Sequence, residues 1–322
     1  MEHYNPFDEM TFTYDRCFLC GDILSETNRA DEHVFPKWLQ REFNLWDQKI
    51  VLLNKTQIPY RKLVIPCCMV CNNEHLNSKI EKKIEKAVKG GYEQFIHLEE
   101  EIIFKWLVKL SYGMLFKELS LRQDLRSSDS RTIIEPKQLK LFRLLFTFLQ
   151  TIRFETEFLN RKPWSILIFK INNPDKENLY DGKDMIMTSN YFLQLNDIGI
   201  ISHLQDNGLM KELFLEHRRE FINMPLHPIQ FRELCAEFHY KSYLIKRIPF
   251  YTIVLPNKHG GKMQIISHDF STDFDEWNNE EFCKLLELYW KPWGITFDQI
   301  YKDKKLRLTY LKNEDGTIKK LF

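Results

Sequence analysis

The chain has 322 residues, which is too long for one small domain, and 46 lysines and arginines nearly balance 45 acidic residues to give a formal net charge of +1. This balance excludes a protein that binds nucleic acid through its global charge, so any such contact needs a local positive patch. No apolar run reaches the ~18–20 residues that span a membrane. The cysteines number seven, and an odd number in so long a chain argues against a disulfide scaffold. We therefore expect a cytosolic protein with two domains, or with one domain and a large extension.

The first part of the chain, residues 1–91, holds the features that indicate chemistry. Five of the seven cysteines lie there, and the stretch "ADEHVFPKW" (30–38) separates two groups of them. The lysine-rich segment 72–90 predicts a helix with one apolar face, and Gly90 and Gly91 together mark its end.

After this part the apolar pattern changes twice. Two stretches of helical periodicity come first, 94–119 and 136–154, and the Ser-rich segment 126–131 between them predicts a loop. The remaining predicted elements are a short helix at 37–46, strands at 165–171, 197–205, 249–256 and 262–270, and helices at 227–240 and 279–290. The segment "NKHGG" joins the last two strands and is a hairpin signal. The predicted fold class is α+β, with a helical connector over 92–160 and an α+β domain over 161–322.

Two Cys-x-x-Cys pairs are the strongest local signal. Cys17 and Cys20 form the first pair, and Cys68 and Cys71 form the second. Two residues between cysteines let both thiolates reach one tetrahedral ion from a tight turn, so two such turns complete a structural zinc site without an open position. Cys67 remains an alternative to Cys68. The competing interpretation is four buried cysteines without a metal, and it has to account for the same spacing twice.

The order of these motifs resembles the zinc-knuckle HNH endonucleases, which belong to the ββα-metal nuclease class. The matching stretches are "CFLC" (17–20), "EHVFP" (32–36), "CMVCN" (68–72) and Glu81 on the predicted helix, and together they cover roughly residues 14–90. The resemblance implies a zinc-stabilised ββα module that hydrolyses phosphodiester bonds of nucleic acid. It implies DNA as the expected substrate and 5′-phosphate and 3′-hydroxyl ends as products.

The resemblance also implies roles for single residues. His33 matches the general base of the family, and a neutral imidazole can take a proton from water near neutral pH. Glu32 and Asn72 match the ligands of a catalytic metal, and their oxygen atoms suit Mg²⁺ or Mn²⁺. The chain departs from the family at Lys62, where a central Asn is expected. This departure supports a second hypothesis, a catalytically silent zinc-knuckle module that binds nucleic acid or protein.

Several of these residues have another interpretation. Asp31 competes with Glu32 as the metal ligand. Asn72 is also a good helix N-cap. Glu81 is either a member of the site or a surface acid, and His75 is either a member of the site or an exposed helix residue.

The predicted helix carries a row of lysines that recur at helical spacing on one face. The row consists of Lys79, Lys82, Lys83 and Lys86. It is either a solvated face or a track for the phosphate backbone beside the site. The second interpretation would supply the local positive patch that the total charge does not show.

Beyond residue 92 we recognise no catalytic motif. We expect this extension to select substrate, to sense a signal, or to bind a regulatory partner, a ligand or a second copy of the chain. A nuclease joined to such an extension is consistent with bacterial defence against foreign nucleic acid.

Overall fold

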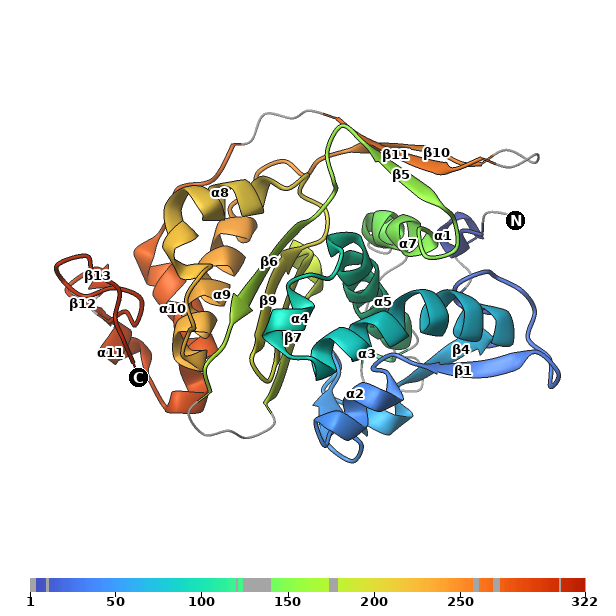
Figure 1. Cartoon of the computed structure of the whole chain (residues 1–322), viewed down its shortest axis with the longest axis horizontal. Helices are drawn as coiled ribbons and strands as arrows, with labels where there is room; N and C mark the ends of the chain where they lie inside the picture. The colour runs from blue at the N-terminus through green and yellow to red at the C-terminus, as the bar shows by residue number, and fades with distance from the viewer. Residues whose placement is uncertain are drawn as a thin grey trace. The chain divides into compact units, whose positions relative to one another are not determined.

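The computed structural model describes residues 4–9, 12–119, 121–123, 140–173, 179–256, 261–268, 273–306 and 308–321. Within these ranges the chain is a mixed α+β protein that divides into two compact units (Figure 1). The first unit contains Met1–Gly90, His97–Glu157 and Ile253–Ile265, and the second contains Gly91–Ile96, Phe158–Thr252 and Ile266–Phe322. The helices expected to form a separate connector therefore pack mainly within the first unit.

Two antiparallel strand pairs form the frame of the first unit. The pairs are β1 (Arg29–His33) with β4 (Val64–Cys68), and β2 (Lys49–Val51) with β3 (Gln57–Pro59). The short helix α1 (Pro6–Glu9) precedes these strands, α2 (Lys37–Glu42) connects β1 to β2, and η1 (Tyr60–Lys62) connects β3 to β4. In the first pair Arg29 faces Cys68 and Glu32 faces Ile65. The second cysteine pair therefore begins at one end of the strand pair, and Glu32 lies near the other end.

A continuous helical segment follows β4, as the sequence predicts. Its first part, η2 (Cys71–Glu81), is wound as a π-helix, and its second part, α3 (Lys82–Lys89), is α-helical and ends at Gly90. A π-helix has more residues per turn than an α-helix, so side-chain positions before and after residue 81 follow different periods. Figure 1 shows this helix beside β1 and β4.

The long helix α5 (Glu100–Leu119) forms the centre of the first unit. Almost all of its side chains are buried, and it packs against β4, η2, α3 and α7 (Arg143–Gln150), which follows η3 (Lys140–Phe142). At Gly113 a Cβ atom would lie 2.9 Å from Val34 Cγ1, so only glycine lets α5 approach the end of β1 this closely. The predicted loop 126–131 and the beginning of the predicted helix 136–154 lie outside the described residues.

A three-stranded sheet has the order β10 (Tyr251–Val254), β11 (Met263–Ser267) and β5 (Thr156–Leu159). The predicted pairing of the strands at 249–256 and 262–270 is therefore confirmed. Most of the segment that joins them lies outside the described part of the chain.

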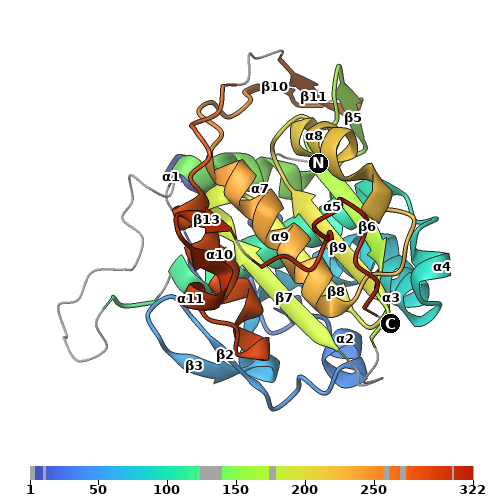
Figure 2. The same cartoon turned by 90° about the vertical axis from the view of Figure 1, so that its left-hand side faces the viewer.

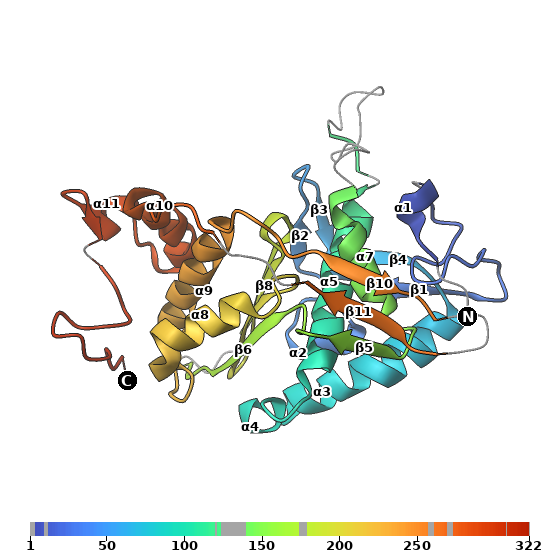
Figure 3. The same cartoon turned by 90° about the horizontal axis from the view of Figure 1, so that it is seen from above.

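The second unit is built on an antiparallel sheet with the order β6 (Ser165–Lys170), β9 (Ile198–His203), β8 (Asn190–Leu195) and β7 (Tyr180–Met185). Helices α8 (Leu209–Arg218), α9 (Pro228–Tyr243) and α10 (Asn279–Trp290) gather on one side of it (Figures 2 and 3). The smaller elements are α4 (Tyr92–Phe95), η4 (Ile186–Thr188), η5 (Arg219–Phe221), η6 (Lys291–Trp293), α11 (Phe297–Ile300), β12 (Tyr301–Lys302) and β13 (Lys305–Leu306). A core of buried Phe, Leu and Ile side chains from the sheet and helices holds this unit together.

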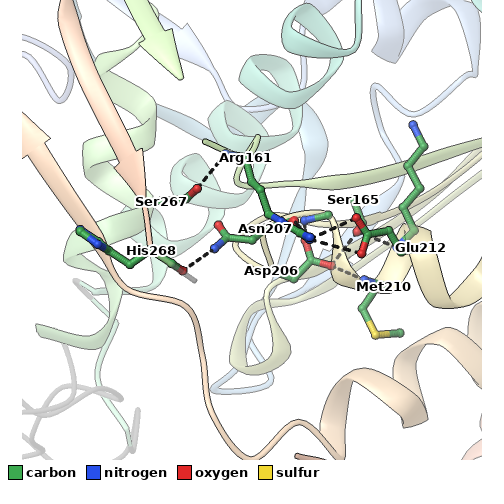
Figure 4. Close-up of polar contacts among 10 residues, drawn as sticks. Arg161, Ser165, Asp206, Asn207, Met210, Glu212, Ser267 and His268 are labelled. Atoms are coloured by element: carbon green, nitrogen blue, oxygen red, sulfur yellow. Dashed lines mark hydrogen bonds and ion pairs between the residues drawn. The ribbon is translucent and has the colours of Figure 1, made fainter. Parts of the chain in front are cut away.

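Polar contacts fix the loop between β9 and α8 (Figure 4). Asp206 accepts hydrogen bonds from Ser165 Oγ at 2.6 Å and from the backbone N–H of Met210 at 2.8 Å, so it satisfies an N–H group in the first turn of α8. Asn207 donates its amide N–H to the carbonyl oxygen of His268 at 3.2 Å. Within the described residues, no helix is both long and apolar enough to cross a membrane.

Candidate functional site

Four cysteines converge at one end of the β1–β4 pair. The Sγ atoms of Cys17, Cys20, Cys68 and Cys71 all lie within 4.8 Å of one another. The first two sit on a tight turn in which the N–H of Gly21 donates to the carbonyl oxygen of Cys17 at 2.9 Å. The other two lie at the end of β4 and at the start of η2. The cluster could hold a structural metal such as zinc, because four thiolates complete a tetrahedron.

The geometry distinguishes Cys68 from Cys67. Consecutive residues of a strand point to opposite faces, and Cys68 is the one that joins the cluster. Its Sγ lies 3.7 Å from Cys20 Sγ and accepts a hydrogen bond from the N–H of Cys71 at 3.4 Å. The choice of Cys68 from its spacing therefore agrees with the structure.

A separate pocket of about 220 Å³ brings together the residues that the sequence proposes for catalysis. Glu32 and His33 reach it from the end of β1, and Asn72 and Glu81 reach it from η2. The rest of the lining consists of Asp31, Pro36, Lys37, Trp38 and Asn77. The side chain of Asp31 is exposed and pairs with that of Arg29 at 3.1 Å, whereas Glu32 is buried.

His33 is neutral and partly enclosed in this pocket. Burial, together with the charges of Lys37 and Lys109, lowers the pKa of His33 to about 4. Gln40 lies on α2, is fully buried, and places its Nε2 atom 3.4 Å from His33 Nδ1 and 2.6 Å from the carbonyl oxygen of Phe35. An amide nitrogen can only donate, so this contact favours the tautomer in which His33 Nδ1 carries the lone pair.

Lys109 of α5 contacts the site residues Glu32 and Glu81, a contact that sequence analysis did not predict. Its side chain is 1% exposed, and its Nζ atom lies 2.5 Å from Glu32 Oε1 and 2.9 Å from Glu81 Oε1. The same atom donates to the carbonyl oxygens of His33 at 2.8 Å and Val34 at 2.9 Å. Burial alone would lower the pKa of Lys109, but the two carboxylates outweigh it, raise the pKa and keep the ammonium charged.

This network bears on the catalytic metal that the resemblance implies. Glu32 Oε1 contacts Lys109, and Glu32 Oε2 accepts a hydrogen bond from Asn72 Nδ2 at 2.9 Å. Both oxygens are thus engaged, and Asn72 turns its amide N–H group toward Glu32. In the part of the chain that the structure describes, the cysteine cluster is the one group of three or more His, Cys, Asp or Glu side chains close enough together to hold a metal. The arrangement does not fit a divalent ion bound by Glu32 and Asn72.

Two residues of this site, Lys109 and Gln40, were missed by sequence analysis. A signal for Lys109 was present, because a lysine in a helix that is apolar on nearly every side needs a buried partner. Gln40 carried no comparable signal. It contacts the His33 loop, whereas Lys62, at the position where the resemblance expects an Asn, is exposed.

The lysine row lies on the outside of the helix that follows the cluster. Lys79, Lys82, Lys83 and Lys86 are all exposed, as either interpretation of the row requires. Lys79 differs from the others because its Nζ atom lies 3.1 Å from His75 Nδ1. His75 itself is buried, so the interpretation of an exposed helix residue is wrong.

Comparison with known proteins found no match: no protein-family model, no curated protein and no solved structure is significantly similar to this chain. The family resemblance therefore rests on the motifs quoted from the sequence. What the site does has to be argued from its own geometry.

Proposed function

We propose that the first unit is an HNH-type nuclease site that hydrolyses phosphodiester bonds of nucleic acid, with DNA as the expected substrate. One observation supports this proposal most: Glu32, His33 and Asn72 line a single pocket although Asn72 is 40 residues away from Glu32 in the chain. They do so on two antiparallel strands followed by a helix, with a four-cysteine cluster beside them. This is the order of elements that the ββα-metal resemblance implies.

The chemistry assigned to the chain's own residues is proton transfer. His33 accepts the proton of the attacking water at Nδ1, and the long 3.4 Å contact with Gln40 Nε2 has to open so that the water can reach this lone pair. The lowered pKa leaves the ring neutral at neutral pH and also makes it a weaker base than a free histidine. Lys37 lines the same pocket and attracts the negatively charged phosphate.

The resemblance implies Mg²⁺ or Mn²⁺ for this reaction, and such an ion would stabilise the leaving oxygen. Since Glu32 is already engaged by Lys109 and Asn72, we assign no step to an ion held by Glu32.

A second candidate function has its own support. The ion pair of Lys109 with Glu32 engages the carboxylate that the resemblance expects to bind the catalytic metal. This favours a catalytically silent module that binds nucleic acid through the lysine row. Such a module would keep the cysteine cluster and the row and would not cut.

The two functions are separated by a cleavage and binding experiment. Purified protein is incubated with plasmid, single-stranded DNA and RNA, each with Mg²⁺, with Mn²⁺ and without added metal. The nuclease proposal expects cutting that His33→Ala lowers by ~10²–10⁴-fold, with zinc content and nucleic-acid binding unchanged. Binding without cutting on every substrate would favour the silent module.

Asp31→Ala is the matched control for His33→Ala. Asp31 is the neighbouring pocket residue but one not in the proton path, and its exposed side chain pairs with Arg29. We expect it to cut within a few-fold of the parent protein. Equal cutting by His33→Ala and the parent would remove His33 from the mechanism.

A further inference from the structure

The surroundings of Lys109 support an inference that does not depend on whether the protein cuts nucleic acid. Its ammonium is enclosed by two carboxylate oxygens, from Glu32 and Glu81, and by the carbonyl oxygens of His33 and Val34. These four oxygens lie 2.5–2.9 Å from Nζ. An ammonium has three N–H donors, so four acceptors are more than it needs. A cluster made only of oxygen atoms is the type of site that hard cations occupy.

The charges of Glu32, Glu81 and Lys109 also indicate a position for one cation between the two carboxylates. Glu32 and Glu81 come from different elements, β1 and η2; Glu32 is buried, the side chain of Glu81 is 13% exposed, and a cation between the two carboxylates offsets their mutual repulsion. Lys109 supplies one positive charge, at a depth where its side chain is 1% exposed. A divalent ion added to the same oxygens would meet this ammonium and be repelled by it.

The main chain is arranged to bring the ammonium there. Gly113 lies one helical turn after Lys109 on α5, and it is the residue whose missing Cβ lets the helix approach Val34. Lys109 then reaches the backbone of His33 and Val34 directly. The close approach and the cation contacts therefore belong to one packing arrangement.

We propose that the ammonium of Lys109 occupies the cation position between Glu32 and Glu81, as a built-in replacement for a divalent metal ion. The native pocket then does not bind Mg²⁺ or Mn²⁺ through these carboxylates. Removal of the ammonium leaves an oxygen site that a divalent ion fills.

Binding of Mn²⁺ tests the proposal without any cleavage assay. The full chain, with zinc in the cysteine cluster, is titrated with Mn²⁺, and free Mn²⁺ is followed by electron paramagnetic resonance. We expect Lys109→Met to bind one Mn²⁺ at least tenfold more tightly than the wild type. We also expect Mn²⁺ to raise the unfolding temperature of this variant but not that of the wild type. The double variant Lys109→Met/Glu81→Gln should lose the gain.

Lys105→Met is the matched control. Lys105 precedes Lys109 by one turn on α5 and pairs with Glu101 at 2.6 Å, away from the pocket, so this variant should bind Mn²⁺ as the wild type does. A folded Lys109→Met chain that gains no Mn²⁺ site overturns the proposal. So does a wild-type chain that binds Mn²⁺ and loses it in Glu32→Gln. This wild-type measurement decides the matter if Lys109→Met fails to fold.

Discussion

Glu233 shows how strongly burial acts on a single charge in the second unit. It lies on α9, 1% exposed, and accepts hydrogen bonds from the hydroxyl of Thr309 and from the backbone N–H of Tyr310 at 2.7 Å. Burial raises the pKa of Glu233 to about 8, although these hydrogen bonds lower it. Among the described residues Glu233 forms no ion pair, so its carboxyl group avoids a buried charge by staying protonated.

This pKa predicts how the stability of the second unit depends on pH. Between the unfolded pKa of ~4.3 and the native value of about 8, the native state binds one more proton than the unfolded state, so stability falls as pH rises. From pH 7 to 9 we expect a loss of about 1 kcal/mol in the free energy of unfolding that Glu233→Gln does not show. Calorimetry on both proteins measures it. Parallel pH profiles would contradict the shifted pKa.

At the scale of elements, one tight turn, the end of β4 and the start of η2 have to meet to build the cysteine cluster. The first turn is held from outside, because Gln150 of α7 donates to the carbonyl oxygen of Leu19 at 2.9 Å. At Gly21, with φ +81°, a Cβ atom would collide with the ring of Tyr4. The local conformation that positions Cys17 and Cys20 thus depends on glycine and on a distant helix.

We predict one zinc per chain, bound by these four cysteines. Cys68→Ser should lose the zinc and destabilise the first unit, because the binding energy of structural zinc is folding energy. Cys67→Ser is the matched control: Cys67 is also buried on β4 but lies outside the cluster, so it should keep one zinc. Elemental analysis of reduced protein measures both. Zinc loss in the Cys67 variant alone would reverse the assignment.

The lysine row predicts a salt effect on binding. Neutralising Lys79, Lys82, Lys83 and Lys86 with Gln should weaken nucleic-acid binding. Each lost contact with duplex DNA should lower the log–log salt slope by roughly 0.9. The control neutralises four exposed lysines of the second unit: Lys302, Lys304, Lys305 and Lys320. Binding isotherms at several salt concentrations measure the slopes. Equal slopes in the row variant and the parent would identify the row as a solvated face.

At the scale of the whole molecule, the cysteine cluster and the polar loop at Asp206 belong to different compact units. Each unit has its own buried core. A perturbation of the cluster should therefore act on one unit.

Removal of zinc tests this division. We expect a chelator to increase amide hydrogen exchange across β1, β4 and η2 by more than tenfold and to leave β6, β8 and β9 within twofold, because only the first group is tied to the cluster. Hydrogen-exchange mass spectrometry on the full chain measures both groups. An equal increase in the second sheet would mean that the units unfold together.

Local patterns in the sequence were enough for several parts of this protein. The cysteine spacing predicts the cluster, Gly90 predicts the helix end, and the strand-like run 262–270 predicts β11 and its pairing. These features depend on neighbours within a few residues, or on a repeat that a metal imposes. The strands β7 and β8 were missed, because "YDGKDM" alternates weakly and most of β8 is apolar without a clear period.

Only the tertiary structure decided what surrounds Glu32. Its cation, Lys109, is 77 positions away in the chain and reaches it because α5 packs against the end of β1 at Gly113. The sequence alone determined that Glu32, His33 and Asn72 would be candidates, since their motifs are short and ordered. It could not determine whether Glu32 faces a metal ion or an ammonium, because a buried charge takes its partner from whatever element the fold places against it.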